Sequence, residues 1–221
     1  MNIKDKKIVI IGDSHVDWSW FGKTLEADLA SKGASVTRHG WGGSAAANWI
    51  AGQKIFGKQY TLKGVAGGGP YDVALVVLGS NDAANAQRAS MEGGPTLAAG
   101  VATASQKILQ VAGSLNARTS FWVGPPAMGT KSPYWTNGAM DALWKATSPL
   151  FGERALDSRP ATRPHVATGD GVHMGKPGAE AWTAFVVTEI SKQEASVGSA
   201  ASVGLLIVAG ALLIVQMLRR K

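Results

Sequence analysis

A serine, an aspartate and a histidine in two short polar stretches have the types and spacing needed for nucleophilic chemistry. Ser14 lies three residues beyond an apolar run, and Asp170 and His173 lie three residues apart in a glycine-containing stretch. A serine hydroxyl becomes a good nucleophile only when a base takes its proton, and that base needs an acid to orient it. The spacing of Asp170 and His173 lets the carboxylate reach one ring nitrogen and turn the other outward. Taken alone, Ser14 fits a helix-capping turn as well as it fits a nucleophile.

Two further polar stretches carry groups that can stabilise a developing negative charge. Residues 40–44 form a glycine-rich turn at a predicted strand end, where backbone N–H groups at a helix N-terminus are exposed. Asn81 follows another apolar run, and its side-chain amide can donate to an oxyanion. The alternatives are a flexible turn, whose glycines satisfy backbone geometry, and an Asx turn at Asn81.

Short apolar runs without a helical period predict the strands that position these groups. Residues 8–11, 72–78 and 119–123 are typical of strands buried on both faces of a parallel sheet. Ligands of such sheets bind outside the carboxyl ends of the strands, which is where the polar stretches lie. The remaining predicted elements are a strand at 34–38, helices at 18–30, 45–50, 96–115, 139–150 and 180–191, and loops at 51–71 and 83–95.

The composition is that of a globular domain and excludes several kinds of site. The chain has 221 residues, 45% hydrophobic and 17% charged, which is enough for a sizeable core and an appendage. It has no cysteine, so disulfides, zinc–thiolate sites and a cysteine nucleophile are excluded. Residues 219–221 supply three of the seven net positive charges. The rest of the chain has a net charge of +4 and no basic stripe interleaved with aromatic residues, which argues against a nucleic-acid partner.

Four polar blocks occur in order along the chain and together resemble the SGNH hydrolase family, the GDSL-type esterases and lipases. The blocks are Gly12-Asp13-Ser14, Gly42-Gly43-Ser44, Gly79-Ser80-Asn81-Asp82 and Asp170-Gly171-Val172-His173, and the resemblance covers residues 7–191. It implies a flavodoxin-like three-layer α/β/α sandwich with a parallel sheet of about five strands. It also implies chemistry that needs no metal and no organic cofactor.

The resemblance implies a catalytic role for three residues. Ser14 would be the nucleophile, His173 the general base and then the general acid, and Asp170 the residue that orients His173. Asp13 would then be a structural residue of the turn, and His15 would not be the base. The first block reads Gly-Asp-Ser-His rather than Gly-Asp-Ser-Leu, a variant that the family tolerates.

The resemblance also implies an oxyanion hole with three donors. These would be the backbone N–H groups of Ser14 and Gly42 and the side-chain amide of Asn81. The Gly-x-Ser spacing favours Gly42, but the glycine doublet leaves Gly43 open as the alternative.

The implied activity is hydrolysis of carboxylic esters through an acyl-enzyme, on a small-molecule or glycan ester. Trp41, Trp49 and Trp135 are predicted near the mouth of the site, with Trp41 and Trp135 as substrate-binding residues. Aromatic faces often stack on sugar rings, so O-acetyl groups on a glycan are the favoured substrate. Trp18 and Trp182 are expected in the core.

Three alternatives to this function stay open. A lipase or lysophospholipase that hydrolyses fatty-acyl esters is equally compatible with a membrane anchor. A metal-dependent phosphoesterase would use Asp13, His15 and Asn81 as ligands of a hard or borderline metal, although no second His-rich cluster accompanies them. A non-catalytic, membrane-tethered binding module would keep the fold without the reaction.

A stretch without charge, residues 195–218, predicts a single-pass C-terminal transmembrane helix. At about 1.5 Å per residue it reaches roughly 36 Å, enough for a hydrocarbon core of about 30 Å. The predicted organisation is an SGNH hydrolase domain at 1–193, a small-residue linker and start of the anchor at 194–202, and an anchor with a basic end at 203–221. Residues 203–218 would contact the membrane of a cell or a virion, and a buried helix of the globular domain is the alternative. The side of the membrane and the oligomeric state stay open.

Overall fold

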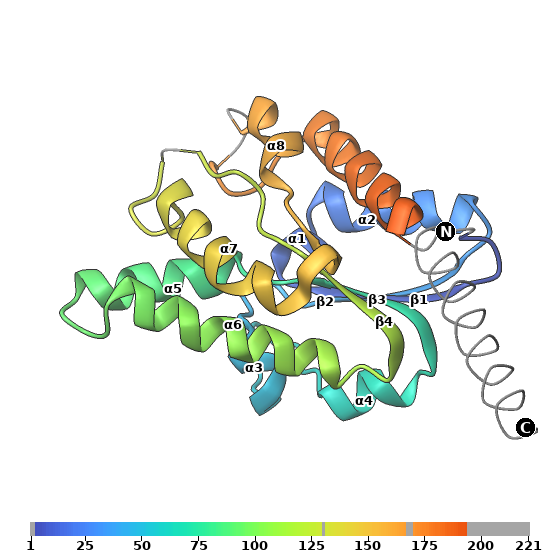
Figure 1. Cartoon of the computed structure of the whole chain (residues 1–221), viewed down its shortest axis with the longest axis horizontal. Helices are drawn as coiled ribbons and strands as arrows, with labels where there is room; N and C mark the ends of the chain where they lie inside the picture. Colours follow the sequence, from blue (N-terminus) through green and yellow to red (C-terminus); the bar gives the residue numbers. More distant parts are fainter. Residues whose placement is uncertain (1–2, 130, 167–169, 194–221) are drawn as a thin grey trace, which may run out of the picture.

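The computed structural model describes residues 3–129, 131–166 and 170–193, which form a five-stranded sheet with helices on both faces (Figure 1). The strands are β1 (Lys7–Gly12), β2 (Ser35–Gly40), β3 (Tyr71–Val77), β4 (Ala117–Val123) and β5 (Ala155–Leu156). Their order in the sheet is β2-β1-β3-β4-β5, and every neighbouring pair is parallel. This is the flavodoxin-like order, so the predicted α/β sandwich with about five parallel strands is confirmed.

The burial of the strands shows why apolar runs predicted the centre of this sheet. Ile8 to Ile11 of β1 are 0% exposed, and β3 is buried at six of its seven positions. The edge strand β2 reads Ser-Val-Thr-Arg-His-Gly and is partly exposed along most of its length. A strand covered on both faces needs apolar side chains at every position, whereas an edge strand does not.

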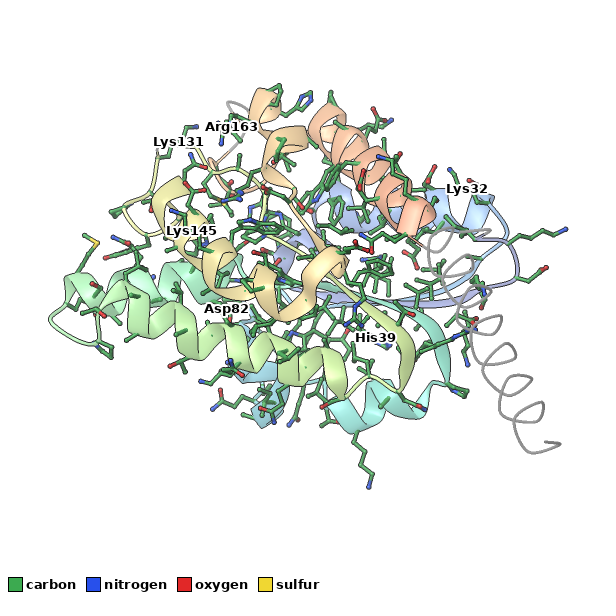
Figure 2. All side chains as sticks on the ribbon, in the orientation of Figure 1. Lys32, His39, Asp82, Lys131, Lys145 and Arg163 are labelled. Carbon is green, nitrogen blue, oxygen red and sulfur yellow. The ribbon has the colours of Figure 1, made fainter. Side chains whose placement is uncertain are left out.

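Helices on the two faces of the sheet complete the three layers. On one face lie α2 (Trp20–Ser31) and a helix at 176–193; on the other lie α3 (Ala46–Ala51), α6 (Leu97–Gly113) and α7 (Asn137–Phe151) (Figure 1). Side chains fill the space between each helical layer and the sheet (Figure 2). The other elements are α1 (Ser14–Asp17), α4 (Leu62–Gly67), α5 (Ser80–Met91), α8 (Arg159–Thr162), η1 (Gly152–Arg154) and η2 (Arg163–His165).

A buried tryptophan fixes the helix at 176–193 against α2. Trp182 stacks on Phe21 with ring centroids 3.7 Å apart, and its indole N–H donates to Ser158 Oγ at 2.7 Å. The prediction that Trp182 is a core residue is therefore confirmed. Because this helix begins three residues after His173, the same contacts restrict where the histidine can lie.

Two segments predicted as loops contain helices. Most of the predicted loop at 83–95 belongs to α5, which continues to Met91. Its buried apolar residues are alanines, which allow close packing but give a weak apolar period, so the pattern did not reveal a helix. The predicted loop at 51–71 is interrupted by α4, which is only six residues long.

The predicted linker at 194–202 and anchor at 203–221 lie outside the described residues. Within the described part of the chain, no helix is both long and apolar enough to cross a membrane. Membrane attachment through residues 203–218 stays a prediction from the sequence.

Candidate active site

The turn after β1 places Ser14 at the carboxyl edge of the sheet. Asp13 is the N-cap of α1, and its Oδ1 accepts the His15 backbone N–H at 2.9 Å. A glycine is needed just before this cap, because a Cβ at Gly12 would lie 2.4 Å from Val16 Cγ2. Ser14 therefore occupies the first position of α1, where it is 8% exposed.

A continuous chain of hydrogen bonds joins Ser14, His173 and Asp170. His173 Nε2 lies 2.8 Å from Ser14 Oγ, and His173 Nδ1 lies 2.7 Å from Asp170 Oδ2. The other carboxylate oxygen, Asp170 Oδ1, accepts the backbone N–H groups of Val172 at 2.9 Å and His173 at 2.7 Å. The structure thus brings together the three residues that the sequence proposed for proton transfer, at distances suited to it.

The surroundings of Asp170 keep its carboxyl group ionised. Partial burial acts to raise the pKa of Asp170, but hydrogen bonds from the His173 backbone, the His173 ring and the Val172 N–H together lower it from 3.8 to about 2. An ionised carboxylate beside Nδ1 favours the tautomer that carries its proton on Nδ1. Nε2 is then free to accept the proton of Ser14.

Two donors predicted for the oxyanion hole lie at helix starts, at or beside Ser14. Asn81, in the first turn of α5, lines the same cavity as Ser14. Its Nδ2 donates to the Ser44 carbonyl oxygen at 3.0 Å, which orients the amide, and lies 3.5 Å from Asp13 Oδ2. The Ser14 N–H belongs to the first turn of α1, where backbone N–H groups have no intrahelical partner.

The two glycines of the doublet differ in what their N–H groups do. The Gly42 N–H donates to Asp17 Oδ2 at 3.0 Å and is therefore already engaged. Gly43 lines the cavity, and its N–H takes part in none of the hydrogen bonds found among the described residues. Gly43 has a φ of +74°, and a Cβ there would lie 2.9 Å from Phe56 Cε2, so glycine is strongly favoured. The assignment of the oxyanion amide to Gly42 stays a prediction, and Gly43, whose N–H has no such partner, is the alternative that this geometry favours.

A cavity of about 390 Å³ opens beside Ser14. Apart from the residues already described, its walls are formed by Trp18, Phe56, Ser132, Trp135 and Val172. Trp135 therefore lies where the sequence placed it, and two further aromatic side chains accompany it.

Trp41 and Trp49 were expected near the mouth of the site, but neither lines the cavity that contains Ser14. Both side chains are 0% exposed, and their rings pack edge to face with centroids 5.4 Å apart. The Trp49 indole N–H donates to Ser44 Oγ at 3.0 Å. The two tryptophans fill the core beneath the glycine turn, and Trp41 reaches only the wall of a smaller cavity beside the one that contains Ser14.

Trp18 and Phe56 are site residues that the sequence did not identify. Trp18, expected in the core, is 54% exposed, and its ring centroid lies 4.2 Å from that of His173. The apolar period counted from Trp18 was misleading, because α2 begins only at Trp20. Phe56 is 89% exposed in a turn between Ile55 and Lys58, in a stretch whose residue pattern predicts neither a helix nor a strand.

Three buried titratable groups lie behind the site. Burial is the main reason that the pKa of Asp13 rises from 3.8 to about 7 and that the pKa of Asp82 rises from 3.8 to about 6. Burial, with a smaller effect of His173, lowers the pKa of His15 from 6.5 to about 3. His15 is therefore neutral near pH 7, and its Nε2 is buried without a partner among the described residues.

Among the residues that the structure describes, no three His, Cys, Asp or Glu side chains are grouped so as to hold a metal ion. The ligands of the phosphoesterase alternative make other contacts. The Asp13 carboxylate accepts the His15 backbone N–H, and the Asn81 amide donates to the Ser44 carbonyl oxygen.

Comparison with known proteins identifies the fold. No protein-family model and no curated protein sequence matches this chain. Axe2, an acetylxylan esterase from Geobacillus stearothermophilus, has a similar structure, with a TM-score of 0.59 at 17% identity over 86% of this chain and 96% of its own. LAE5, an α/β hydrolase from the metagenome of Lake Arreo, gives a TM-score of 0.59 at 14% identity over 84% of this chain and 95% of its own. The chain therefore has the fold of the SGNH-type esterases.

Proposed function

We propose that this protein is a serine ester hydrolase that removes O-acetyl groups from a glycan. The observation that carries the proposal is the unbroken chain of hydrogen bonds from Ser14 Oγ through His173 to Asp170. The esterase fold supports the reaction class, and the acetylxylan esterase Axe2 among the similar structures supports the substrate class.

Acylation follows from the geometry of the three residues. His173 Nε2 takes the Ser14 hydroxyl proton while Oγ forms a bond to the carbonyl carbon of the ester. Negative charge develops on the carbonyl oxygen, next to the N–H groups of Ser14 and Gly43 and the amide of Asn81. Each such donor contributes about 3 kcal/mol to transition-state stabilisation. The bond to the alcohol oxygen then breaks, and His173 returns the proton to that oxygen.

Deacylation uses the same groups in reverse. His173 Nε2 takes a proton from water as the water oxygen attacks the acyl-enzyme carbonyl. The bond between the carbonyl carbon and Ser14 Oγ then breaks, and His173 returns the proton to Oγ. The carboxylic acid is released. Asp170 accepts the hydrogen bond of the His173 Nδ1–H throughout and stabilises the imidazolium that forms in each half-reaction.

The walls of the cavity favour a ring-shaped alcohol over a long acyl chain. Trp18, Phe56 and Trp135 stand around Ser14, and the first two are largely exposed. Exposed aromatic faces suit a ligand with an apolar face and a hydrated rim, such as a pyranose. A fatty-acyl chain would gain more from an enclosed apolar channel.

Ser14→Ala tests the nucleophile on the full chain. We expect it to lower hydrolysis of p-nitrophenyl acetate by at least about 10⁴-fold, since both half-reactions need Oγ. A fluorophosphonate probe should label the unchanged protein and not the variant. Ser31→Ala, at an exposed position of α2, is the matched control and should behave as the unchanged protein.

Other results would overturn the proposal. Undiminished turnover by Ser14→Ala would remove Ser14 from the mechanism. Absence of labelling and of turnover in folded protein would favour the binding module. A preference for octanoyl over acetyl esters, with no release of acetate from acetylated xylo-oligosaccharides, would favour a lipase.

A further inference from the structure

A second cavity adjoins the cavity that contains Ser14. It measures about 200 Å³, and its walls include the Asp17 and Lys58 side chains. Trp18, Gly42 and Phe56 line both cavities. The two cavities therefore lie side by side and share part of their walls.

A tight hairpin holds Phe56 at the boundary between the two cavities. Ile55 and Lys58 exchange both backbone hydrogen bonds, each at 3.0 Å. Phe56 and Gly57 between them have φ values of +46° and +80°, as a two-residue hairpin turn requires. Positive φ is uncommon for a bulky residue, and here it presents a ring that is 89% exposed beside Gly43. Phe56 and the exposed Trp18 line the same cavity, and exposed apolar side chains that lie together mark a binding surface.

An ion pair supplies the polar groups of the second cavity. Lys58 Nζ pairs with Asp17 Oδ1, and Asp17 Oδ2 accepts the Gly42 N–H at 3.0 Å. The Lys58 side chain is 49% exposed and that of Asp17 is 15% exposed, so both reach solvent at the cavity. The Trp41 indole N–H also donates to the Ile55 carbonyl oxygen at 3.3 Å, which ties the hairpin to the core. A fixed donor and a fixed acceptor thus stand beside an aromatic wall.

We propose that the second cavity is a second sugar subsite, which takes an uncharged pyranose ring linked to the one that carries the ester. This rests on the proposed function. The apolar face of the ring stacks on Phe56 or Trp18, and its hydroxyl groups bond to Lys58 and Asp17. The opposite charges of Lys58 and Asp17 offset each other, which suits a neutral sugar better than an acidic or a basic one.

Chain-length dependence tests the subsite. The full chain should show a higher kcat/KM for acetylated xylo-oligosaccharides than for acetylated single-ring xylosides. Phe56→Ala and Lys58→Met should each lower kcat/KM for the oligosaccharide by about tenfold, and by less for the single ring, because each removes one contact of ordinary strength. The loss should appear mainly in KM.

Two control variants, matched to Phe56→Ala and Lys58→Met, each remove an exposed side chain of the same kind outside the two cavities. Trp20→Ala removes an indole that is 52% exposed and lines neither cavity. Lys54→Met removes an exposed lysine four residues before Lys58 that also lines neither cavity. Both should keep the chain-length preference of the unchanged protein.

A binding measurement separates this inference from the proposed function. Calorimetry with unacetylated xylotriose and the Ser14→Ala protein should detect binding that Phe56→Ala weakens by about tenfold, whether or not esters are hydrolysed. Absence of xylotriose binding would overturn the subsite even if acetyl esters are cleaved. An equal loss of activity on single-ring and oligomeric substrates in Phe56→Ala and Lys58→Met would overturn it as well.

Discussion

Asp13 and His15 form one acid–histidine pair and Asp170 and His173 form another, with the two imidazole centroids 5.1 Å apart. In the second pair the carboxylate contacts the ring, whereas in the first it accepts the histidine backbone N–H instead. The pKa shifts of the two carboxyl groups are opposite: that of Asp170 falls to about 2 and that of Asp13 rises to about 7.

The difference comes from the local backbone and from burial. Asp13 is a helix N-cap, so its carboxylate turns back to the first turn of α1, and it is almost fully buried. Asp170 lies in a turn where one oxygen accepts two backbone N–H groups and the other stays available for the ring. An Asp and a His close in sequence therefore make an acid–base pair only where the backbone directs the carboxylate at the imidazole.

The largest expected effect distinguishes the two histidines. His173→Ala should lower kcat/KM for p-nitrophenyl acetate by about 10⁴-fold, because no base remains for Ser14. His15→Phe keeps a ring between His173 and Trp182 and should change kcat/KM by less than about tenfold. Initial rates of the two purified variants, with folding checked by circular dichroism, make the comparison. Comparable losses in both would mean that His15 also takes part in the proton transfer.

A smaller effect distinguishes the two aspartates. Asp170→Asn should lower kcat/KM by about 10³- to 10⁴-fold, because an amide N–H beside Nδ1 favours the tautomer with its proton on Nε2. Asp13→Asn should cost less than about tenfold, since the Asp13 carboxylate contacts no atom of the His173 ring. Steady-state kinetics on the same acetyl ester provide the test, and a larger loss in Asp13→Asn would reverse the roles of the two pairs.

The contacts of Ser14 with His173 and of His173 with Asp170 were predictable because the positions of these residues depend on local signals. A buried apolar strand ends just before Ser14, and another ends just before Asn81. Parallel strands bring such ends to one edge of the sheet. Asp170 and His173 are close in sequence and lie in one turn, so their contact needs no long-range information.

The features that the sequence did not predict depend on distant contacts. The engagement of the Gly42 N–H is set by Asp17, which lies 25 residues earlier in the chain. The exposure of Trp18 depends on where α2 begins, and the burial of Trp41 depends on the core beneath the glycine turn. The sequence placed Trp41 near the mouth of the site and Trp18 in the core, whereas tertiary packing buries Trp41 and exposes Trp18.

The smallest expected effect concerns stability and distinguishes the two carboxyl groups by their titration. Folding raises the pKa of Asp13 from 3.8 to about 7, so between these values the folded protein binds more protons here than the unfolded chain. This contribution to stability is complete below pH 3.8 and is lost as the pH rises through 7. Asp13→Asn abolishes this titration. The free energy of unfolding of the variant minus that of the unchanged protein should therefore rise by about 2 kcal/mol from pH 5 to pH 7.

Asp170→Asn is the matched control for this pH dependence, because the pKa of Asp170 shifts in the opposite direction. Folding lowers the pKa of Asp170 from 3.8 to about 2, so its contribution is complete above pH 3.8 and is lost only as the pH falls toward 2. The titration of Asp170 itself should therefore add no change, from pH 5 to pH 7, to the difference in unfolding free energy between this variant and the unchanged protein. Urea unfolding at several pH values measures both differences. A constant difference for Asp13→Asn would mean that Asp13 is ionised in the folded protein across this range, and the two pairs would then differ in geometry but not in charge.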